Sequence, residues 1–338
     1  MITARNTNTA MTPVYDYIDS KGVEENTRQG RVLSLPHPLM IEYERPNEMV
    51  NFCSIRNANP FFHFVEMLWM LEARGDLALI KRYVKRMEEY SDDGIGFNAH
   101  YGYNIRRHFN FDQLTEVIDV LRKDPTSRQA VVLIWNPVDL WVDKVTNDRA
   151  CNLTLVFRVL NGTLCMTIFN RSNDAVWGAV SGANITNLGI FQLYVAAALE
   201  LPVGKQWVVS NNLHMYLDNP QTTKLLKHYA GKYPTGNLLE KDPYTEGAVK
   251  PEPLLQPGET VQMLDRDISE LMNTERNDWV SPAKMWETWF VLYTAIPLML
   301  AHKNYRDGNM DGALLDASTI HATDWRLACT NWLQRKMK

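Results

Sequence analysis

The chain lacks the cysteine patterns that mark disulfide-stabilised or zinc-binding proteins. Its 338 residues hold four cysteines, with no CxxC pair and without the density of a disulfide framework. Cysteines used this sparsely are typical of reduced thiols in a cytosolic protein, and they predict no metal site.

Long hydrophobic runs are also missing. The longest, FVLYTAIPLMLA at residues 290–301, is too short to cross a bilayer and contains Pro297. The N-terminal segment MITARNTNTAMTPVYDY has no apolar core of the kind that a signal peptide needs. We therefore expect a cytoplasmic protein without a membrane partner, and a buried helix at residues 290–301.

An excess of positive charge is absent as well. The formal net charge is −4, so no broad basic surface for nucleic acid is predicted, although a local basic pocket is compatible with this value. With 45% hydrophobic and 22% charged residues, the chain can bury a sizeable core in one large domain or two smaller ones.

Hydrophobic periodicity predicts both helices and strands. The dipeptide NG joins two alternating segments over residues 153–170 and predicts a β-hairpin. Residues 1–30 and 91–108 are polar or rich in Gly and Asn, and predict turns and loops. Helical periodicity marks residues 59–90 with a break at Gly75, 112–124, 184–201 and 263–338.

These elements follow no βαβ regularity, so the predicted class is α+β. Residues 231–262 are rich in prolines, glycines and charges, as a long loop would be. We therefore predict a catalytic core at 1–230, a loop-rich connection at 231–262 and a helical C-terminal extension at 263–338.

Cys151 stands directly before the first strand of the predicted hairpin. Taken alone, such a cysteine is more often a small buried hydrophobe than a nucleophile. The segment NRSND follows the second strand and places Arg171, Ser172 and Asp174 together. An arginine fork and a hydroxyl suit a phosphate, although a solvated turn is the plainer interpretation. The hypothesis is a nucleophilic cysteine in a local basic pocket that the net charge hides.

Other residues fit this hypothesis, each with an ordinary structural alternative. Glu66 lies in an apolar helix, where a carboxylate is costly unless it is paired or functional. Arg28 lies in a loop beside a glycine and Arg128 precedes a strand, and each alone is most often a surface residue. His214 and Tyr216 share one side of an extended segment, either as a binding pair or as a packed strand end.

The order and spacing of these segments resemble those of the thymidylate synthase and pyrimidine nucleotide hydroxymethylase superfamily. The resemblance runs from about residue 28 to about residue 219, and its segments are TRQG, VEMLWML, AHYGYNIR, DPTSRQAVVLIWN, ACN, NRSNDAVWG, NITNLGIF and NLHMY. It implies a thymidylate synthase-like fold with a large twisted mixed sheet packed against helices, and a homodimer whose sheets pack back to back. It also implies transfer of one carbon from 5,10-methylenetetrahydrofolate to C5 of a pyrimidine nucleoside monophosphate.

The resemblance assigns three catalytic roles. Cys151 is the nucleophile that adds to C6 of the base, Glu66 organises water and proton transfer, and Tyr101 assists removal of the proton from C5. Adding a thiolate to C6 makes C5 nucleophilic, so one difficult step becomes two easier ones. We expect the neighbouring arginines to favour the thiolate form of Cys151.

The remaining matched positions are implied to bind ligands. They are Arg28, Arg171 and Ser172 for the 5′-phosphate, Arg128 donated across the dimer, Asn184 for the base, His214 and Tyr216 for the sugar hydroxyl, and Asp174 for the folate pterin.

The superfamily contains two reactions. A synthase reduces the transferred carbon with hydride from the folate, whereas a hydroxymethylase adds water to the same exocyclic methylene. Asn152 replaces the histidine that follows the synthase nucleophile, Gln129 replaces one of an arginine pair, and the tryptophan pair and tail of the synthase folate site are not recognisable. RSNDAVWG and NLHMY resemble phage hydroxymethylases, which implies a viral enzyme acting in a bacterial cytoplasm. Hydroxymethylation is favoured, and methylation of dUMP to dTMP is the alternative.

The identity of the base stays open. An Asn184 amide can donate to O4 and accept from N3–H of uracil, whereas cytosine-specific relatives tend to carry Asp at this position. This favours dUMP. The segment AVWGAVSGA between Asp174 and Asn184 is two residues longer than the family pattern, so dCMP and CMP remain alternatives.

Two other classes of protein compete with this interpretation. A cysteine hydrolase would need a histidine close to Cys151, and no local motif of that kind is present. A nucleotide- or RNA-binding protein on the same fold would bind without turnover. The joint presence of Cys151, Glu66, Tyr101 and Asp174 favours the enzyme.

Overall fold

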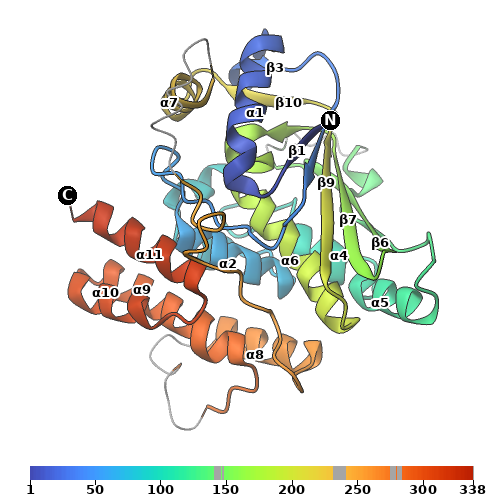
Figure 1. Ribbon diagram of the computed structural model, residues 1–338, viewed down its shortest axis with the longest axis vertical. Helices are drawn as coiled ribbons and strands as arrows, with labels where there is room; N and C mark the ends of the chain where they lie inside the picture. Colours follow the sequence, from blue (N-terminus) through green and yellow to red (C-terminus); the bar gives the residue numbers. More distant parts are fainter. Residues whose placement is uncertain (141–145, 147, 231–240, 275–278, 280–283, 338) are drawn as a thin grey trace.

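The computed structural model describes residues 1–338 except 141–145, 147, 231–240, 275–278, 280–283 and 338 (Figure 1). Within the described residues the strands form two sheets. The larger has the order β1 (Ile2–Ala4), β4 (Leu39–Tyr43), β9 (Val203–Ser210), β7 (Thr163–Asn170), β6 (Asn152–Leu160) and β5 (Val131–Leu133). The smaller has the order β2 (Val23–Thr27), β3 (Gly30–Ser34), β10 (Leu213–Tyr216) and β8 (Asn173–Asp174). Both contain parallel and antiparallel neighbours, which confirms the predicted mixed sheet and the α+β class.

One face of the larger sheet belongs to the hydrophobic core. A row of residues in register across five strands is at most 2% exposed, and it consists of Val132, Leu155, Ile168, Val208 and Ile41. The helices packed against β5, β6, β7 and β9 are α4 (Tyr101–Arg106), α5 (Gln113–Lys123) and α6 (Ala183–Ala198). Since strand side chains alternate between faces, the neighbouring row points away from this core.

That neighbouring row is apolar at several positions and yet exposed. It runs through Leu133, Thr154, Phe169, Val209 and Met40. Leu133 is 44% exposed and Phe169 is 39% exposed in the single chain. We call this row the open face of the sheet.

The two sheets join where two parallel strands of the larger sheet end. β7 leads into β8 through Arg171 and Ser172, and its parallel neighbour β9 leads into β10 through residues 211–212. The backbone N–H of Asn173 donates to the carbonyl of Asn212 over 2.8 Å. The beginning of β6 reaches the same place, because β6 and β7 form the predicted hairpin. Its turn residues Asn161 and Gly162 have φ values of 51° and 73°, as a two-residue type I′ turn requires.

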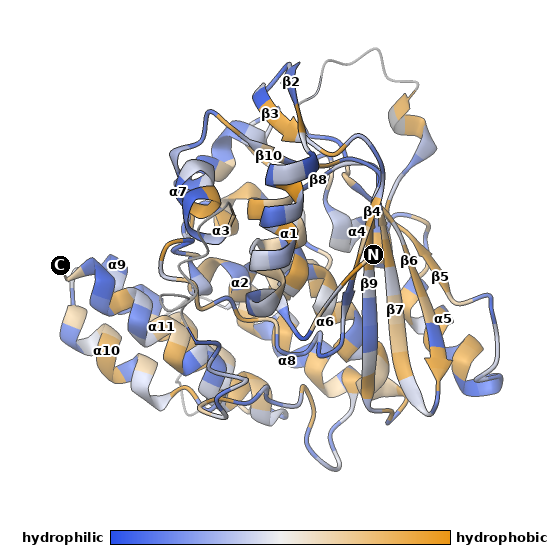
Figure 2. Ribbon diagram, turned by 45° about the horizontal axis from the view of Figure 1, so that its top comes forward, coloured by the Kyte–Doolittle hydropathy of each residue, from blue (hydrophilic) through white to orange (hydrophobic). Residues whose placement is uncertain are grey.

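The helix α2 (Pro60–Leu71) lies between the sheet and the C-terminal helices in both ribbon views (Figures 1 and 2). Asn59 caps its N-terminus by accepting from the Phe62 N–H over 3.2 Å. Phe64 on its outer side meets Trp325 and Phe290 at ring-centroid distances of 4.9 Å and 5.7 Å. The C-terminal elements are α8 (Val261–Asn273), the π-helix η4 (Val291–Ala295), α9 (Ile296–Arg306), α10 (Met310–Thr319) and α11 (Thr323–Lys336).

The C-terminal helices and the buried helix predicted around residue 295 are therefore confirmed. Part of the predicted connection, residues 231–240, lies outside the described residues. Residues 241–260 carry no helix or strand. The boundaries proposed for the core, the connection and the extension stay a prediction. Among the helices of the described residues, none combines the length and the hydrophobicity that a membrane span needs.

Three local predictions differ from the structure. The segment interpreted as polar and turn-rich contains the helix α1 (Thr7–Lys21), because Asn6 and Thr9 form a capping box. Residues 59–90 are not one helix with a break but α2, the short α3 (Leu77–Ile80) and the 3₁₀-helix η1 (Lys85–Tyr90). The predicted loop at 91–108 contains α4, which begins at Tyr101. The remaining helices of the described residues are α7 (Pro220–Tyr229), the 3₁₀-helix η2 (Pro137–Leu140) and the π-helix η3 (Ala175–Ala179).

Candidate active site

Cys151 lies at the junction of the two sheets, one residue before β6. Its side chain is partly buried, and its backbone N–H donates to the phenolic oxygen of Tyr101 over 3.2 Å. Asn152 pairs with Asn170, and the register of β6 against β7 then shifts between Asn152 and Thr154. The regular ladder therefore begins at Thr154, three residues after the cysteine, and such an irregularity redirects side chains at a strand end.

Arg171 is the cation that contacts the thiol. Because β6 and β7 are antiparallel, the start of β6 and the end of β7 meet, and the Arg171 N–H donates to the Cys151 carbonyl over 3.0 Å. The guanidinium donates to the carbonyls of Ala150 and Arg149 over 2.8 Å and 3.1 Å, and to Cys151 Sγ over 3.6 Å. Two carbonyl acceptors therefore fix the guanidinium beside the sulfur.

The pKa of Cys151 depends on two opposing effects, the burial of its sulfur and the charge of nearby arginines. Burial raises the pKa of the thiol above its usual value, and this outweighs the lowering by Arg171 and Arg28. The carboxylates of Asp148 and Asp174 raise it further. The arginines favour the thiolate, as predicted, while burial of the sulfur has the larger and opposite effect on the pKa in the free protein.

Glu66 is buried in α2, with 8% of its surface exposed. Its Oε2 accepts a hydrogen bond from Asn187 Nδ2 on α6 over 2.6 Å. Burial raises the pKa of Glu66 to about 7, against a smaller lowering by the Asn187 contact. A carboxyl group that changes protonation near neutral pH suits acid–base chemistry.

Asp174 caps a helical turn and keeps one oxygen free. Its Oδ1 accepts from the N–H groups of Val176 and Trp177 over 2.6 Å and 3.1 Å, at the start of the π-helix η3 (Ala175–Ala179). Its Oδ2 is buried and has no partner among the described residues. Burial raises the pKa of Asp174 to about 6. A free carboxylate oxygen fits the N–H donors of a pterin ring, so this position is compatible with a bound folate.

His214 and Tyr216 approach the same centre from β10. His214 pairs with Asp174 across the parallel strands β10 and β8. The ring centroids of His214 and Tyr216 lie 5.1 Å apart, so these two residues share one face of β10, as predicted. Tyr216 donates to Gln29 over 2.6 Å. Burial raises the pKa of Tyr216 to about 12, with added contributions from the charges of Asp174 and Cys151.

Asn184 lies in the first turn of α6, where the longer segment ends. A Cβ atom added to Gly178 would clash with Asn173 Oδ1 and would lie 3.1 Å from Asn184 Nδ2. Gly178 therefore allows the two asparagine side chains to approach each other. The inserted segment contains the π-helix η3, whose wider turn takes up an extra residue.

Of the predicted phosphate ligands, Arg171 and Arg28 act on the thiol, and Ser172 adjoins Arg171 in the chain. Arg28 is exposed in the turn between β2 and β3, yet its charge lowers the pKa of Cys151. Ser172 directly follows Arg171 and is partly buried. Arg128 is exposed before the edge strand β5 and is not among the main charges that shift the pKa of Cys151. The contacts and charges that act on Cys151 come from Arg171, Tyr101, Arg28 and Asp174 among the predicted residues, while Glu66 and Asn184 lie on α2 and α6.

Sequence reasoning missed one residue of this site. Asn187 is 1% exposed and holds Glu66. The available signal was a second amide one helical turn after Asn184, within the otherwise apolar sequence NITNLGIF.

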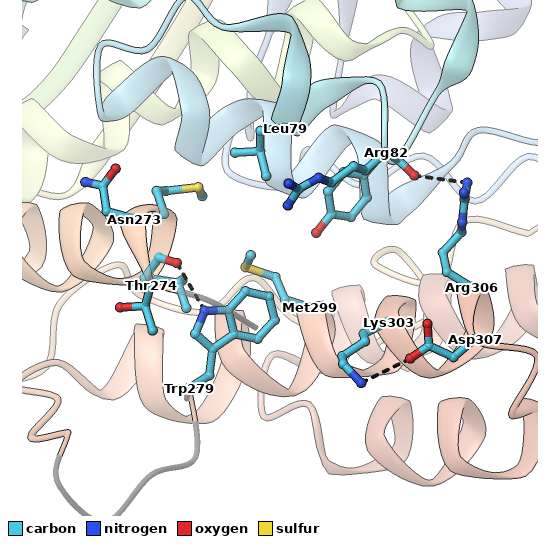
Figure 3. Close-up of a pocket in the computed structure, with 12 residues that line it drawn as sticks. Leu79, Arg82, Asn273, Thr274, Trp279, Met299, Lys303, Arg306 and Asp307 are labelled. Carbon is cyan, nitrogen blue, oxygen red and sulfur yellow. Dashed lines mark hydrogen bonds and ion pairs between the residues drawn. The ribbon is translucent and has the colours of Figure 1, made fainter. Parts of the chain in front are cut away.

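A cavity of about 700 Å³ lies elsewhere, between the C-terminal helices and the segment after α2 (Figure 3). Leu79 and Arg82 face Trp279 and Met299 across it, and none of the predicted site residues lines it. The cysteine–arginine cluster, not this cavity, is therefore the candidate active site.

Comparison with known proteins agrees with this assignment. Residues 12–247 match the thymidylate synthase family model. A deoxyuridylate hydroxymethyltransferase of Pseudomonas phage M6 is 35% identical over 99% of this chain and 94% of its own length. Another, of Bacillus phage SP01, is 33% identical over 72% of this chain and 65% of its own.

The fold agrees as well. The crystal structure of thymidylate synthase from T4 phage superposes with a TM-score of 0.52 at 21% identity, covering 63% of this chain and 78% of that one. This chain belongs to the thymidylate synthase family.

Proposed function

We propose that this protein hydroxymethylates C5 of dUMP with the one-carbon unit of 5,10-methylenetetrahydrofolate. The observation that carries the proposal is the junction of the two sheets, where the Cys151 thiol, the Arg171 guanidinium and the free oxygen of Asp174 converge. The names of the phage relatives, which match along most of the chain, support deoxyuridylate as the substrate.

The 5′-phosphate would lie against Arg28, Arg171 and Ser172. A phosphate dianion and a thiolate are both anions, so one positive pocket favours both. The sugar hydroxyl would meet His214 and Tyr216. Burial lowers the pKa of His214, so a neutral imidazole faces the sugar. Asn184 would read uracil through O4 and N3–H.

Bound methylenetetrahydrofolate supplies the carbon that C5 accepts. The Cys151 thiolate adds to C6, and the displaced electron pair makes C5 nucleophilic. After carbon transfer, C5 loses its proton and the bond from the transferred carbon to the folate nitrogen breaks, so tetrahydrofolate leaves and an exocyclic methylene forms on the base. Water adds there, Glu66 takes the released proton, and the electron pair expels the thiolate from C6. The C5–C6 double bond returns and the thiolate is regenerated.

Tyr101 assists this sequence as a phenol. Burial raises the pKa of Tyr101, and the negative charge of Cys151 raises it further. Its oxygen accepts from the Cys151 N–H, so the ring is tied to the nucleophile's backbone. Tyr101 is therefore suited to orient or relay a proton from C5 and not to act as a phenolate base.

The residue after the nucleophile favours hydroxymethylation over reductive methylation. The synthase pattern has a histidine there, whereas Asn152 forms an amide pair with Asn170 in this chain. Asn152 Oδ1 is buried without a partner among the described residues. A neutral amide at this position supplies a fixed polar group but no titratable ring.

The protein would act as a homodimer through the open face of the larger sheet. The exposed Leu133 and Phe169 lie in one cross-strand row there, and apolar surface of this kind favours association. Arg128 lies at the edge of that face, before β5. This position supports its donation to the phosphate site of the partner subunit.

Mixing two inactive variants tests the shared site. We expect Arg128→Ala and Cys151→Ala to be inactive alone, and their co-expressed mixture to regain about a quarter of wild-type turnover, because random pairing gives half heterodimers with one intact site each. The control is Arg171→Ala mixed with Cys151→Ala. Both residues belong to one subunit's site, so this pair should regain nothing. Absence of rescue in the first mixture would place Arg128 outside the partner's site.

The two deoxyuridylate hydroxymethyltransferases named above are phage proteins, which supports a role in modifying DNA precursors within an infected bacterium's cytoplasm. No direct nucleic-acid or membrane partner is part of the proposal.

Product identity tests the function. The purified protein is incubated with methylenetetrahydrofolate and, separately, dUMP, dCMP or CMP, followed by mass spectrometry of the nucleotide and absorbance of the folate. We expect 5-hydroxymethyl-dUMP and tetrahydrofolate from dUMP. A methyl product with dihydrofolate would show a thymidylate synthase activity, and a product from dCMP or CMP alone would overturn the role given to Asn184.

A further inference from the structure

The contact between Asn187 and Glu66 joins the two helices α6 and α2, which pack against each other. Asn187 lies one turn after Asn184 on α6, and its Nδ2 donates to Glu66 Oε2 over 2.6 Å. Asn187 is 1% exposed and Glu66 is 8% exposed. A short hydrogen bond to a buried carboxylate is charge-assisted and strongly directional.

The other atom of the amide has no such partner. Asn187 Oδ1 is buried, and no hydrogen-bond donor reaches it from the described residues. A buried acceptor without a partner is costly, so native proteins seldom keep one without a use. This acceptor belongs to the same side chain that holds Glu66.

An amide can serve both protonation states of a neighbouring carboxyl group. Its NH₂ donates to a carboxylate, and its carbonyl oxygen accepts from a carboxylic acid or from water. No single hydroxyl or carboxylate side chain offers both a fixed donor and a fixed acceptor in this way. Glu66 needs such a neighbour if it alternates between states during turnover.

We infer that Asn187 is the positioning residue for the addition of water. It holds Glu66 through Oε2, leaves Oε1 to take the proton, and offers its own Oδ1 to the same water molecule. This inference rests on the proposed hydroxymethylase activity. In the step itself, the water oxygen bonds to the exocyclic methylene carbon, and the displaced electron pair restores the C5–C6 double bond and expels the Cys151 thiolate from C6. One water proton passes to Glu66, and the second stays on the new hydroxyl group, which donates to Asn187 Oδ1.

Asn187 is the polar group with the largest effect on the pKa of Glu66. Elements packed against α2, and α2 itself, carry other titratable groups, which include His63, Tyr101, Arg106, Tyr194, Asp265, Asp267, His302, Asp324 and Cys329. Among the described residues, only burial and the Asn187 hydrogen bond shift the pKa of Glu66. Since the hydrogen bond lowers this pKa, its removal must raise it.

Infrared difference titration of the free protein gives a direct test. The carboxyl band of Glu66 is identified by subtracting the spectrum of Glu66→Gln. We expect Asn187→Leu to move the titration midpoint of this band upward by about one pH unit. Asn187→Asp keeps the size and shape of the side chain and should move it further upward, because a second carboxylate then lies beside Glu66.

Thr186→Val is the matched control. Thr186 is buried on the same helix turn, so the variant removes a neighbouring polar group without touching Glu66. We expect its midpoint to equal that of the wild type. An unchanged midpoint in both Asn187 variants would overturn the inference.

Turnover then separates positioning from simple structural support. We expect the acidic limb of the pH–rate profile to shift upward in Asn187→Leu by the amount seen in the infrared titration. Release of the C5 hydrogen should exceed formation of hydroxymethyl product, because the later water step is the one impaired. A uniform loss of both, with an unshifted profile, would reduce Asn187 to a packing residue. Failure of the proposed function is distinguishable, because the wild type itself would then give no hydroxymethyl product.

Discussion

Replacement of Cys151 by alanine is expected to abolish turnover and to leave nucleotide binding nearly intact. Without the sulfur no covalent bond to C6 forms, and C5 stays unreactive. Loss of a covalent nucleophile lowers kcat by about 10⁴-fold or more. Arg171 keeps its place in the variant, because the carbonyls of Ala150 and Arg149 hold the guanidinium independently of the thiol. The affinity for dUMP should therefore change by less than about tenfold, or about 1.4 kcal/mol.

Cys165→Ala provides the matched control for the nucleophile. Cys165 is also a free thiol, but it is buried on β7 and has 2% of its surface exposed. The same chemical change there should leave turnover within a few-fold of wild type. Single-turnover product formation and calorimetric binding of dUMP measure the two effects. Turnover of Cys151→Ala near the wild-type rate would remove the thiol from the reaction.

The direction of the pKa shift of Cys151 could not be predicted from the sequence, although its neighbour Arg171 could. The segments ACN and NRSND predicted the meeting of Cys151 with Arg171, because an NG hairpin fixes which strand ends are adjacent. The same segments could not give the direction of the thiol's pKa shift. That direction depends on how deeply the sulfur is buried by residues distant in sequence, and burial here outweighs the arginines.

Local signals explain which elements of the fold could be predicted. The helix α5 has strong periodicity and an Asp112 cap, and it lies within one residue of its predicted ends. The helix α1 was missed because its first turn is polar and Pro13 stands within it, although the Asn6 cap was present in the sequence. The open face could not be anticipated strand by strand, since its exposure depends on which strands become neighbours.

Some residues of the site could likewise be predicted from the sequence and others could not. Asp174 and His214 were predicted from the compact motifs NRSND and NLHMY, and the structure pairs them across the strands β8 and β10. The partner of Glu66 was not predicted, because α2 and α6 are more than 100 residues apart in sequence, and the 121-residue separation of Glu66 from Asn187 leaves no local pattern. A helix–helix contact of this kind depends on tertiary packing alone.

Replacement of Glu66 by glutamine is expected to stabilise the protein above pH 7 while abolishing hydroxymethylation. Burial raises the pKa of Glu66 from 4.5 to about 7 in the folded state. Between these values the folded state binds more protons than the unfolded state, so stability falls as the pH rises through this window. Above pH 7 the wild type carries the full penalty of a buried charge, roughly 3 kcal/mol. Glutamine is neutral at every pH and escapes this penalty.

Urea unfolding at pH 8 and pH 4.5 separates this effect from packing. Wild type and Glu66→Gln should differ in stability at pH 8 and approach each other at pH 4.5. All proteins are compared at one concentration, because subunit association would otherwise shift the midpoints. Glu116→Gln makes the same chemical change on the exposed side of α5 and should show no such pH-dependent gain.

A stabilised but inactive Glu66→Gln variant would locate the origin of the raised pKa. The carboxylate would then be held in an unfavourable site because the reaction needs a base that ionises near neutral pH. A variant less stable than wild type at pH 8 would mean the reverse. The hydrogen bond from Asn187 would then offset the burial of the charge, and Glu66 would serve the packing of α2 against α6 as much as the chemistry.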